Sequence, residues 1–258
     1  MRDMSKRIVI QVIPWVIPLL LLIIWQLASQ FEILPARILP APSEITAAAY
    51  DLVHSGEIWP HLWASTHRAV IGLLIGGGIG FIFGLINGLS KISAMFFDSS
   101  IQMLRNIPHL ALIPLIILWF GIGEEGKIFL IALGVMFPIY LNTFHGIRSV
   151  DKDYIEMGNN YGLSNLAAFW HIILPGALPS ILVGLRYALG IMWVTLIVAE
   201  TIAANDGIGF LAMDAREFMQ MDVVVLSIIL YALLGKLSDM MAKSLEFRFL
   251  KWHLSYQK

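Results

Sequence analysis

The chain of 258 residues contains no cysteine and few charged residues. The absence of cysteine excludes a disulfide scaffold, thiolate catalysis and zinc-thiolate sites. Only 14% of the residues are charged, against roughly a quarter in soluble globular proteins, whereas 58% are hydrophobic. The net charge of −1 provides no basic surface for nucleic acid. Because so apolar a chain cannot cover itself in water, we predict an integral membrane protein with a single domain, residues 1–258.

Motifs that carry chemistry are scarce as well. We find no cluster with the spacing of a metal site and no nucleophile beside a base, so the sequence predicts no metal site and no catalytic residue. The segment Gly121–Lys127 has the spacing of a nucleotide-binding P-loop. However, Ile128 follows where a magnesium-binding hydroxyl is required, and no strand precedes the segment. We interpret it as a turn and expect the chain itself to bind no cofactor.

Long stretches without charge indicate the membrane helices. None of the 24 residues between Arg7 and Glu32 is charged, nor any of the 22 residues between Arg68 and Lys91. Since a bilayer core requires about 20 apolar residues per helix, the sequence predicts an all-α membrane protein with six transmembrane helices. The predicted spans are 8–30, 68–89, 101–121, 127–146, 177–203 and 222–241.

The distribution of lysine and arginine predicts the orientation of these spans. With the N-terminus in the cytoplasm, 13 of the 17 basic residues lie in cytoplasmic segments, as the positive-inside rule requires. An even number of spans then places both termini in the cytoplasm. The basic residues left on the outer side are Arg37, Arg68, Lys127 and Arg216.

Glycines recur at every fourth position in the second predicted span. At helical pitch they form a stripe along which another backbone can approach closely. Two interpretations stay open, namely tight static packing and a helix that slides or pivots against its neighbour. The stripe consists of Gly72, Gly76, Gly80, Gly84 and Gly88.

Prolines interrupt the third and fourth predicted spans. Pro108 and Pro114 lie in the third span, and Pro138 lies in the fourth. Because proline lacks a backbone N–H and clashes with the preceding turn, we expect these helices to be kinked or locally opened. Broken helices at membrane depth occur where they line a protein-buried cavity, and a transport path is one such cavity.

Polar and ionisable residues within or beside the spans are candidates for a translocation path. Such groups cost several kcal/mol in a membrane unless they are paired or hydrated. For the two arginines, snorkelling to the interface is the alternative to an anion-handling surface. A histidine alone is more typical of packing than of ligand binding. The candidates are Arg105, Asn106, His109, Arg186 and Glu200.

A segment of 30 residues, 147–176, separates the fourth and fifth spans and is too long for a simple connector. The residues before Gly162 predict one short helix, and Gly162 permits the positive φ of a turn. Leu163–Ile173 predicts a second, amphipathic helix that ends at Pro175. A helical pair on the cytoplasmic face indicates a docking surface, to which Glu156 contributes a charge. An ordinary amphipathic loop is the alternative.

The spacing of this segment resembles the EAA loop of permeases from importers of the ATP-binding-cassette (ABC) type. That loop reads Glu-Ala-Ala, three residues, Gly, nine residues and Ile-x-Leu-Pro, and Met157 and Gly158 stand here in place of the two alanines. In the family the loop fits a cleft on the ATPase subunit and transmits its closure to the membrane helices. The resemblance therefore implies that residues 147–176 form the ATPase-coupling loop. The matching positions are Glu156, Gly162, Ile172, Leu174 and Pro175.

Other segments narrow the resemblance to the nitrate/sulfonate/taurine branch of these permeases. Within that branch, Leu174–Ser180 and Asp214–Phe218 look most like the aliphatic sulfonate permeases. The resemblance implies the type I importer fold and a place in the bacterial cytoplasmic (inner) membrane. The segments that carry the branch resemblance include Arg37–Pro42, Ile101–Leu115, Phe137–Thr143, Gly184–Ala188 and Ala199–Thr201.

The resemblance further implies a transmembrane subunit of an ATP-driven importer, with no enzymatic activity of its own. The expected partners are two ATPase subunits that carry ATP and Mg, a second copy of this chain, and an extracytoplasmic binding protein that delivers an aliphatic sulfonate. Arg105 and Asn106 are expected to offset dehydration of the sulfonate anion. Taurine, nitrate or another small substrate of the branch is the alternative. A self-sufficient secondary transporter is disfavoured, because among possible coupling carboxylates only Glu200 approaches the membrane interior.

Overall fold

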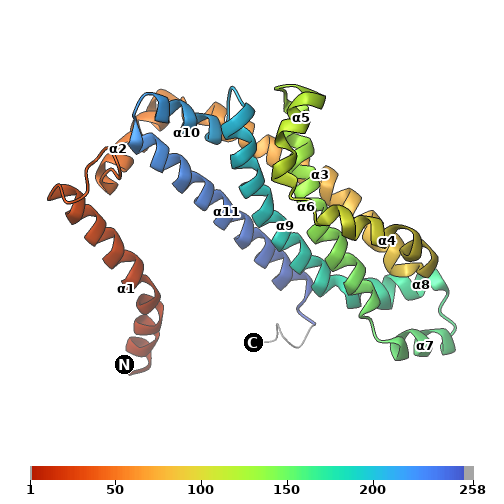
Figure 1. The fold of residues 1–258 in the computed structure, drawn as a ribbon. Coiled ribbons are helices and arrows are strands. Elements are labelled where there is room, and N and C mark those ends of the chain that lie inside the picture. Colours follow the sequence, from red (N-terminus) through yellow and green to blue (C-terminus); the bar gives the residue numbers. More distant parts are fainter. Residues whose placement is uncertain (1, 253–258) are drawn as a thin grey trace.

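The computed structural model describes residues 2–252, and within them the side chains of all residues except 2–12, 14, 15 and 203. All regular elements in this described part of the chain are helices (Figure 1). The long helices are α1 (Arg2–Gln30), α3 (Ile58–Leu89), α6 (Glu124–Arg148), α9 (Leu174–Ala203) and α11 (Met221–Phe249). The shorter helices are α2 (Pro42–Ser55), α4 (Lys91–Arg105), α5 (Ile113–Phe120), α7 (Lys152–Asn160), α8 (Asn165–Ala168) and α10 (Ile208–Glu217). A 3₁₀ turn covers His109–Leu112 and a π-helical turn covers Phe169–Ile173.

Four helical stretches are long and apolar enough to cross a bilayer: α3, α6, α11 and the continuous stretch Asn165–Ile202. The bent pair Lys91–Arg105 and His109–Phe120 makes a fifth if it is counted as one span. In α1 the apolar stretch whose side chains are described, Val16–Gln30, is shorter. The described residues therefore support a helical membrane protein with four or five spans. The first part of the predicted span 8–30 consists largely of residues whose side chains the structure does not describe.

The third predicted span, 101–121, is broken and combines the end of α4 with the 3₁₀ turn and α5. Helix α4 begins at Lys91 and ends at Arg105. The next helical stretch, His109–Phe120, is bent by 79° relative to α4. Pro108 supplies the reason, because it lacks a backbone N–H and disfavours the helical conformation of the residue before it. The predicted kink at Pro108 is confirmed, whereas Pro138 lies inside the unbroken helix α6.

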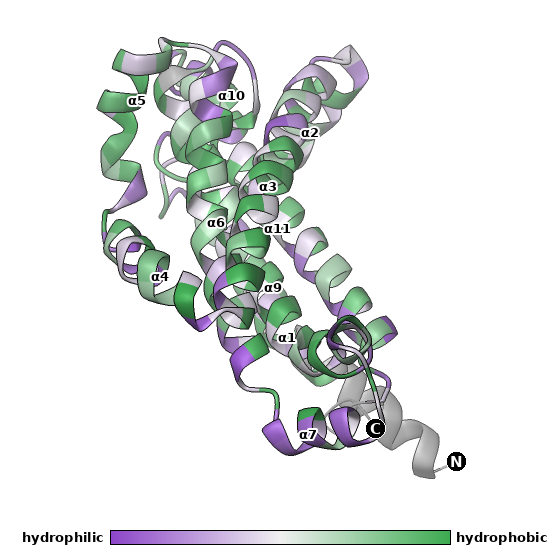
Figure 2. Ribbon diagram, turned by 90° about the vertical axis from the view of Figure 1, so that its right-hand side faces the viewer, coloured by the Kyte–Doolittle hydropathy of each residue, from purple (hydrophilic) through white to green (hydrophobic). Residues whose placement is uncertain are grey.

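Three helices, α3, α6 and α9, form the centre of the molecule, and α11 packs against α9 (Figure 1). Their largest buried cluster combines apolar residues from all four helices, among them Ala69, Val135, Leu196 and Tyr231. The opposite ends of the bundle are polar. Figure 2 shows hydrophilic residues at α7 on one end and around α2 and α10 on the other, with apolar helices between them. We call these the α7 end and the α10 end.

The glycine stripe of α3 lies against α6. A Cβ atom built on Gly76 or Gly80 would overlap the carbonyl oxygen of Ala132 or Met136, respectively. A Cβ on Gly84 would lie 2.6 Å from Cβ of Thr143. No side chain fits in these positions, so the two helix backbones touch, and the stripe is a close-packing surface in this structure. The remaining two glycines of the stripe, Gly72 and Gly88, likewise face Ile131 and Ile147.

We predict that Gly80→Leu disrupts the packing of α3 on α6. The leucine would overlap the Met136 carbonyl, and overpacking of this kind costs about 3 kcal/mol. The measurement is the amount of protein in the membrane and its melting temperature in detergent. Gly78→Leu is the matched control, because a Cβ at Gly78 meets nothing within 4 Å. Equal stability of the two variants would contradict the packing role of the stripe.

Candidate functional site

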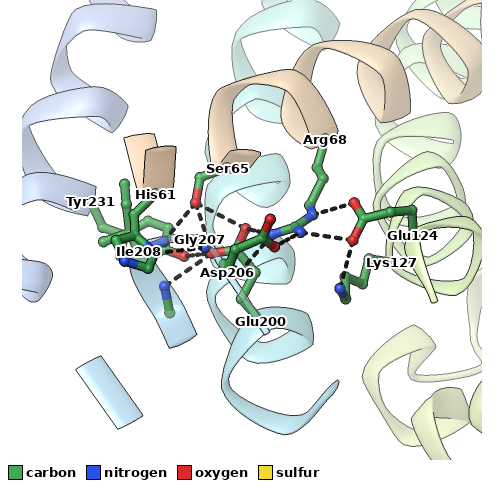
Figure 3. Close-up of polar contacts among 11 residues, drawn as sticks. His61, Ser65, Arg68, Glu124, Lys127, Glu200, Asp206, Gly207, Ile208 and Tyr231 are labelled. Atoms are coloured by element: carbon green, nitrogen blue, oxygen red, sulfur yellow. Dashed lines mark hydrogen bonds and ion pairs between the residues drawn. The ribbon is translucent and has the colours of Figure 1, made fainter. Parts of the chain in front are cut away.

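An ion-pair network at the α10 end centres on the buried Arg68 of α3 (Figure 3). Its guanidinium group donates to Glu124 of α6 through Nε (2.6 Å) and Nη2 (2.7 Å), and to Glu200 of α9 through Nη1 (2.7 Å). Asp206, in the connection between α9 and α10, accepts from the guanidinium through both its backbone and its side chain. Lys127 reinforces Glu124 at 2.8 Å. One arginine, itself only 1% exposed, thus joins three segments of the chain.

Glu200 is the second centre of this network and is also 1% exposed. Its carboxylate accepts hydrogen bonds from the hydroxyls of Ser65 (2.8 and 2.9 Å) and Tyr231 (2.8 Å) and from the backbone N–H of Gly209 (3.0 Å). A buried carboxylate requires this kind of compensation, because an ionised group without partners is very costly in a low-dielectric interior. Both oxygens of Glu200 are therefore engaged in joining α3, α9, α10 and α11.

Gly207 lets the chain enter α10 directly above the Glu200 carboxylate. Its φ of +105° is accessible to glycine, and a Cβ atom there would overlap the carboxylate. The Gly207 N–H donates to Nδ1 of His61 (3.1 Å), and the next N–H, of Ile208, donates to Ser65 (2.8 Å). The connection between α9 and α10 is thus bound to α3 through backbone donors as well as through Asp206.

Sequence reasoning missed most of this network. It placed Arg68 and Lys127 among the outer basic residues and treated Glu200 as a path candidate, whereas the structure buries all three in one cluster. A signal was present, because Ser65 and Arg68 are spaced to share one helix face and a lone arginine in an apolar helix needs a partner. The partner itself, 132 residues away, has no local signature.

The segment 147–176 folds as a helical pair at the α7 end. Asp151 caps α7 by accepting from the backbone N–H of Asp153 (3.0 Å), and Gly162, with φ of +80°, forms the turn after α7. Gly158 is buried against the second half of the pair, since a Cβ there would lie 2.6 Å from Cδ1 of Ile172. Glycine at this position therefore permits the two halves of the segment to touch.

The outer surface of α7 is exposed and combines charge with apolar side chains. Glu156 and Met157 are exposed, and so are Tyr154 and Tyr161, the latter by 84%. A shallow hollow of about 420 Å³ lies among Glu156, Met157 and Tyr161. Exposed apolar groups around a charged side chain are typical of a contact surface for another protein.

The second helix of the segment does not end at Pro175, as the sequence predicted. The helix continues from Asn165 to Ile202, so that α8, the π-helical turn and α9 form one stretch, with Leu174 and Pro175 in the first turn of α9. Proline is tolerated in a first helical turn, and the preceding π-turn bonds the Leu174 N–H to the Phe169 carbonyl. The segment is therefore continuous with a membrane helix.

The five candidate path residues are not brought together. Arg105 and Asn106 are exposed at the break after α4, and His109 packs against α9 with Nε2 3.0 Å from the hydroxyl of Thr195. Arg186 pairs with Asp239 of α11 at 2.6 Å. Fourteen residues of α9 separate Arg186 from Glu200, a helical rise of about 21 Å. These residues therefore belong to at least two separate sites.

Comparison with known protein families gives a match over residues 76–251. The matching family is described as "Binding-protein-dependent transport system inner membrane component". Two similar proteins are provisionally named aliphatic sulfonates transport permease protein SsuC. The one from Escherichia coli (strain K12) is 59% identical over 97% of this chain and 95% of its own length. The one from Bacillus subtilis (strain 168) is 44% identical over 93% of this chain and 87% of its own length.

More distant proteins match this chain as well. The taurine transport system permease protein TauC of Escherichia coli (strain K12) is 36% identical over 90% of this chain and 86% of its own length. Among solved structures, an amino acid ABC transporter with histidines matches with a TM-score of 0.58 at 16% identity, covering 76% of this chain and 97% of its own. The methionine ABC transporter MetNI matches with a TM-score of 0.52 at 18% identity, covering 72% of this chain and 93% of its own. These structures show a shared fold.

We predict that Arg68→Met strongly destabilises the protein. Removing one partner of a buried ion pair costs about 3–5 kcal/mol, because Glu200 would stay buried without a compensating charge. Melting temperature in detergent and abundance in the membrane measure the effect. The control is Arg216→Met, since Arg216 is exposed in the last turn of α10. A melting temperature of Arg68→Met equal to that of the control would show that the network is dispensable.

Proposed function

Because this chain belongs to the family of binding-protein-dependent transport system inner membrane components, we propose that it is the transmembrane subunit of an ATP-driven importer of aliphatic sulfonates. The proposed substrate rests on the 59% identity, over nearly the whole chain, with a protein named for aliphatic sulfonate transport. Taurine is a less supported alternative, because the taurine permease is 36% identical.

A separate ATPase subunit hydrolyses ATP for this permease. The segment with P-loop spacing forms a turn at Gly121–Gly123 followed by the start of α6. Its lysine, Lys127, is buried and donates to Glu124 in the Arg68 network. The lysine of a nucleotide site must reach phosphates, so this one is committed to a structural role.

The coupling role of the segment 147–176 rests on its surface and on its continuity with α9. In our proposal an ATPase subunit binds the exposed face of α7 around Glu156 and Met157, while the buried Gly158 holds α7 against the second half of the segment. Movement of this helical pair passes to the membrane through Ile172, Leu174 and Pro175, because the helix runs without a break from Asn165 to Ile202. A continuous helix transmits displacement, whereas a flexible connector would absorb it.

The proposed orientation follows from this docking. The α7 end faces the cytoplasm, both termini are cytoplasmic, and residues 8–30 complete six spans in the bacterial inner membrane. The extracytoplasmic binding protein approaches the α10 end. Two copies of the chain form the pathway with two ATPases. Arg105, Asn106 and His109 lie where the third span is broken, and non-helical backbone at membrane depth is tolerated where it lines a cavity.

Reconstituted transport tests the proposed function. We expect the permease, its ATPase and its binding protein in proteoliposomes to take up labelled butanesulfonate only with ATP. Taurine or nitrate at equal concentration should enter at least tenfold more slowly, because the binding protein selects the substrate. An ATPase with its nucleotide-binding lysine replaced is the control. Uptake that persists with this inactive ATPase would instead indicate a secondary transporter.

We predict that Glu156→Lys abolishes uptake while the protein still inserts into the membrane. The side chain is exposed on α7, so reversing its charge leaves the fold intact. The substitution places a cation at the position where, in our proposal, the ATPase contacts a carboxylate. The measurements are membrane abundance, co-purification of the ATPase and sulfonate uptake. Glu32→Lys makes the same charge change at an exposed position after α1 and should behave as wild type. Full transport by Glu156→Lys would count against the docking role.

A further inference from the structure

A second network of polar side chains joins α3, α4 and α6, apart from the Arg68 network. The Tyr140 hydroxyl of α6 accepts a hydrogen bond from Nδ2 of Asn87 in α3 (2.9 Å) and donates one to Oδ1 of Asp98 in α4 (2.7 Å). Asn87 in turn accepts a hydrogen bond from the hydroxyl of Ser93 in α4 (2.5 Å). Tyr140 and Asn87 are buried, so these bonds connect the three helices from the inside.

One hydrogen bond connects α6 directly to α4. Among the described residues, the bond from Tyr140 to Asp98 is the only hydrogen bond between these two helices, and Asp98 forms no ion pair there. The side-chain amide of Gln102, on α4 itself, donates to the same carboxylate oxygen at 3.5 Å. Because an ionisable group in a membrane helix needs a partner, the Tyr140 hydroxyl both compensates Asp98 and holds α4 to α6.

Helix α4 has few other contacts that fix its position. Ala94 is the only buried residue among its 15 residues. A mostly apolar cavity of about 270 Å³, bordered by α3, α4 and α6, lies beside Ile101 and Leu104 in the second half of the helix. Elements with few buried contacts change position at low cost. The position of α4 therefore depends on the hydrogen bonds in its first half.

A column of side chains on α6 connects Tyr140 to the segment 147–176. Tyr140, Phe144 and Arg148 follow one another at intervals of four residues, so they share one face of the helix. The rings of Tyr140 and Phe144 stack with their centroids 5.9 Å apart, and Cζ of Arg148 lies 4.4 Å from the Phe144 centroid. Arg148 also donates to the backbone carbonyl of Asn87 (3.4 Å). Arg148 ends α6, which leads directly toward α7 (Figure 1).

We propose that Tyr140 is a positioning residue for transport, through which movement of the segment 147–176 sets the position of α4. This role rests on the proposed function and adds a second route to the one through α9. When the ATPase displaces the segment, Arg148 and Phe144 pass the displacement along α6 to Tyr140. The Tyr140 hydroxyl then moves α4 through its bond to Asp98.

Movement of α4 reaches the interrupted third span. Helix α4 ends at Arg105, and the 79° bend separates it from the stretch His109–Phe120. The cavity beside Ile101 and Leu104 gives the second half of α4 space to approach α3 and α6. A shift of α4 therefore displaces Arg105 and the break that follows it, which links the ATPase to the position of the break.

Removal of one hydroxyl tests this link in the full complex reconstituted in proteoliposomes, with labelled butanesulfonate as the probe. Tyr140→Phe keeps the ring on Phe144 but removes the donor to Asp98. We expect this variant to assemble and to hydrolyse ATP in response to the loaded binding protein. It should import about tenfold fewer sulfonates per ATP, a factor that corresponds to the loss of one hydrogen bond to a charged acceptor.

Tyr50→Phe is the matched control, because Tyr50 is exposed on α2, and it should keep the wild-type ratio of uptake to ATP hydrolysis. A wild-type ratio in Tyr140→Phe would overturn the proposal. Loss of complex assembly in Tyr140→Phe would overturn it as well, because the hydroxyl would then serve folding alone.

The hydrogen bond is tested as a unit by changing its acceptor. We expect Asp98→Ala to lower uptake per ATP as much as Tyr140→Phe does, and the double variant to be no worse than either, because both changes remove one interaction. Asp98→Asn keeps an acceptor oxygen and should stay close to wild type. Effects that multiply in the double variant would overturn the proposal, as would equal impairment of Asp98→Asn and Asp98→Ala.

Movement of α4 is measured with a spin label at Met103→Cys, since the chain has no other cysteine. Met103 is 71% exposed near the end of α4, and the permease is labelled before the complex is assembled. We expect the spectrum of the label to differ between the nucleotide-free and the vanadate-trapped complex, and this difference to disappear in Tyr140→Phe. An equal difference in both backgrounds would overturn the proposal.

The unmodified complex separates this proposal from the proposed function. Absence of ATP-dependent uptake there would overturn the proposed function itself. ATP-dependent uptake with an unchanged spectrum of the label at position 103 would overturn only the role of Tyr140 and α4.

Discussion

The buried ion pair between Arg68 and Glu200 is the interaction on which the arrangement of the helices depends. It joins α3 to α9, and the same two side chains reach α6 through Glu124 and α11 through Tyr231. Burying two charges is favourable only when geometry and additional hydrogen bonds compensate their lost hydration. Those bonds come from groups on different helices, so the compensation exists in one arrangement only. The network therefore specifies how four helices meet at the α10 end.

Below this network the bundle is held by close approach of backbones. Lipid is as apolar as leucine, so burial of apolar side chains provides little preference for one helix neighbour over another. The glycines of α3 solve this problem sterically, because Gly76 and Gly80 bring the backbones of α3 and α6 into contact. Polar pairing at one end and glycine packing along the length together make the α3–α6 contact the most extensive among the described helices.

Local sequence features predicted the helices well and their connections less well. Charge-free stretches identified α3 and α6, and apolar runs with few charges identified α9 and α11, because a bilayer core requires long apolar helices. Pro108 predicted a break but not its 79° angle, which depends on what the two halves pack against. Pro175 was predicted to end a helix and instead lies in the first turn of one, since the same residue suits both positions. The partners of Arg68 lie 56 to 138 residues away and only the fold brings them together.

Two arginines in membrane helices illustrate how environment assigns a role to the same side chain. Arg68 is 1% exposed and donates five hydrogen bonds to carboxylates and a carbonyl, so no substrate anion reaches it. Arg186 is 42% exposed beside a cavity, and the aspartate that neutralises it is shared with Lys243. Burial and saturated hydrogen bonding therefore assign Arg68 to the framework of the bundle, whereas Arg186 belongs to a partly exposed ion-pair cluster between α9 and α11.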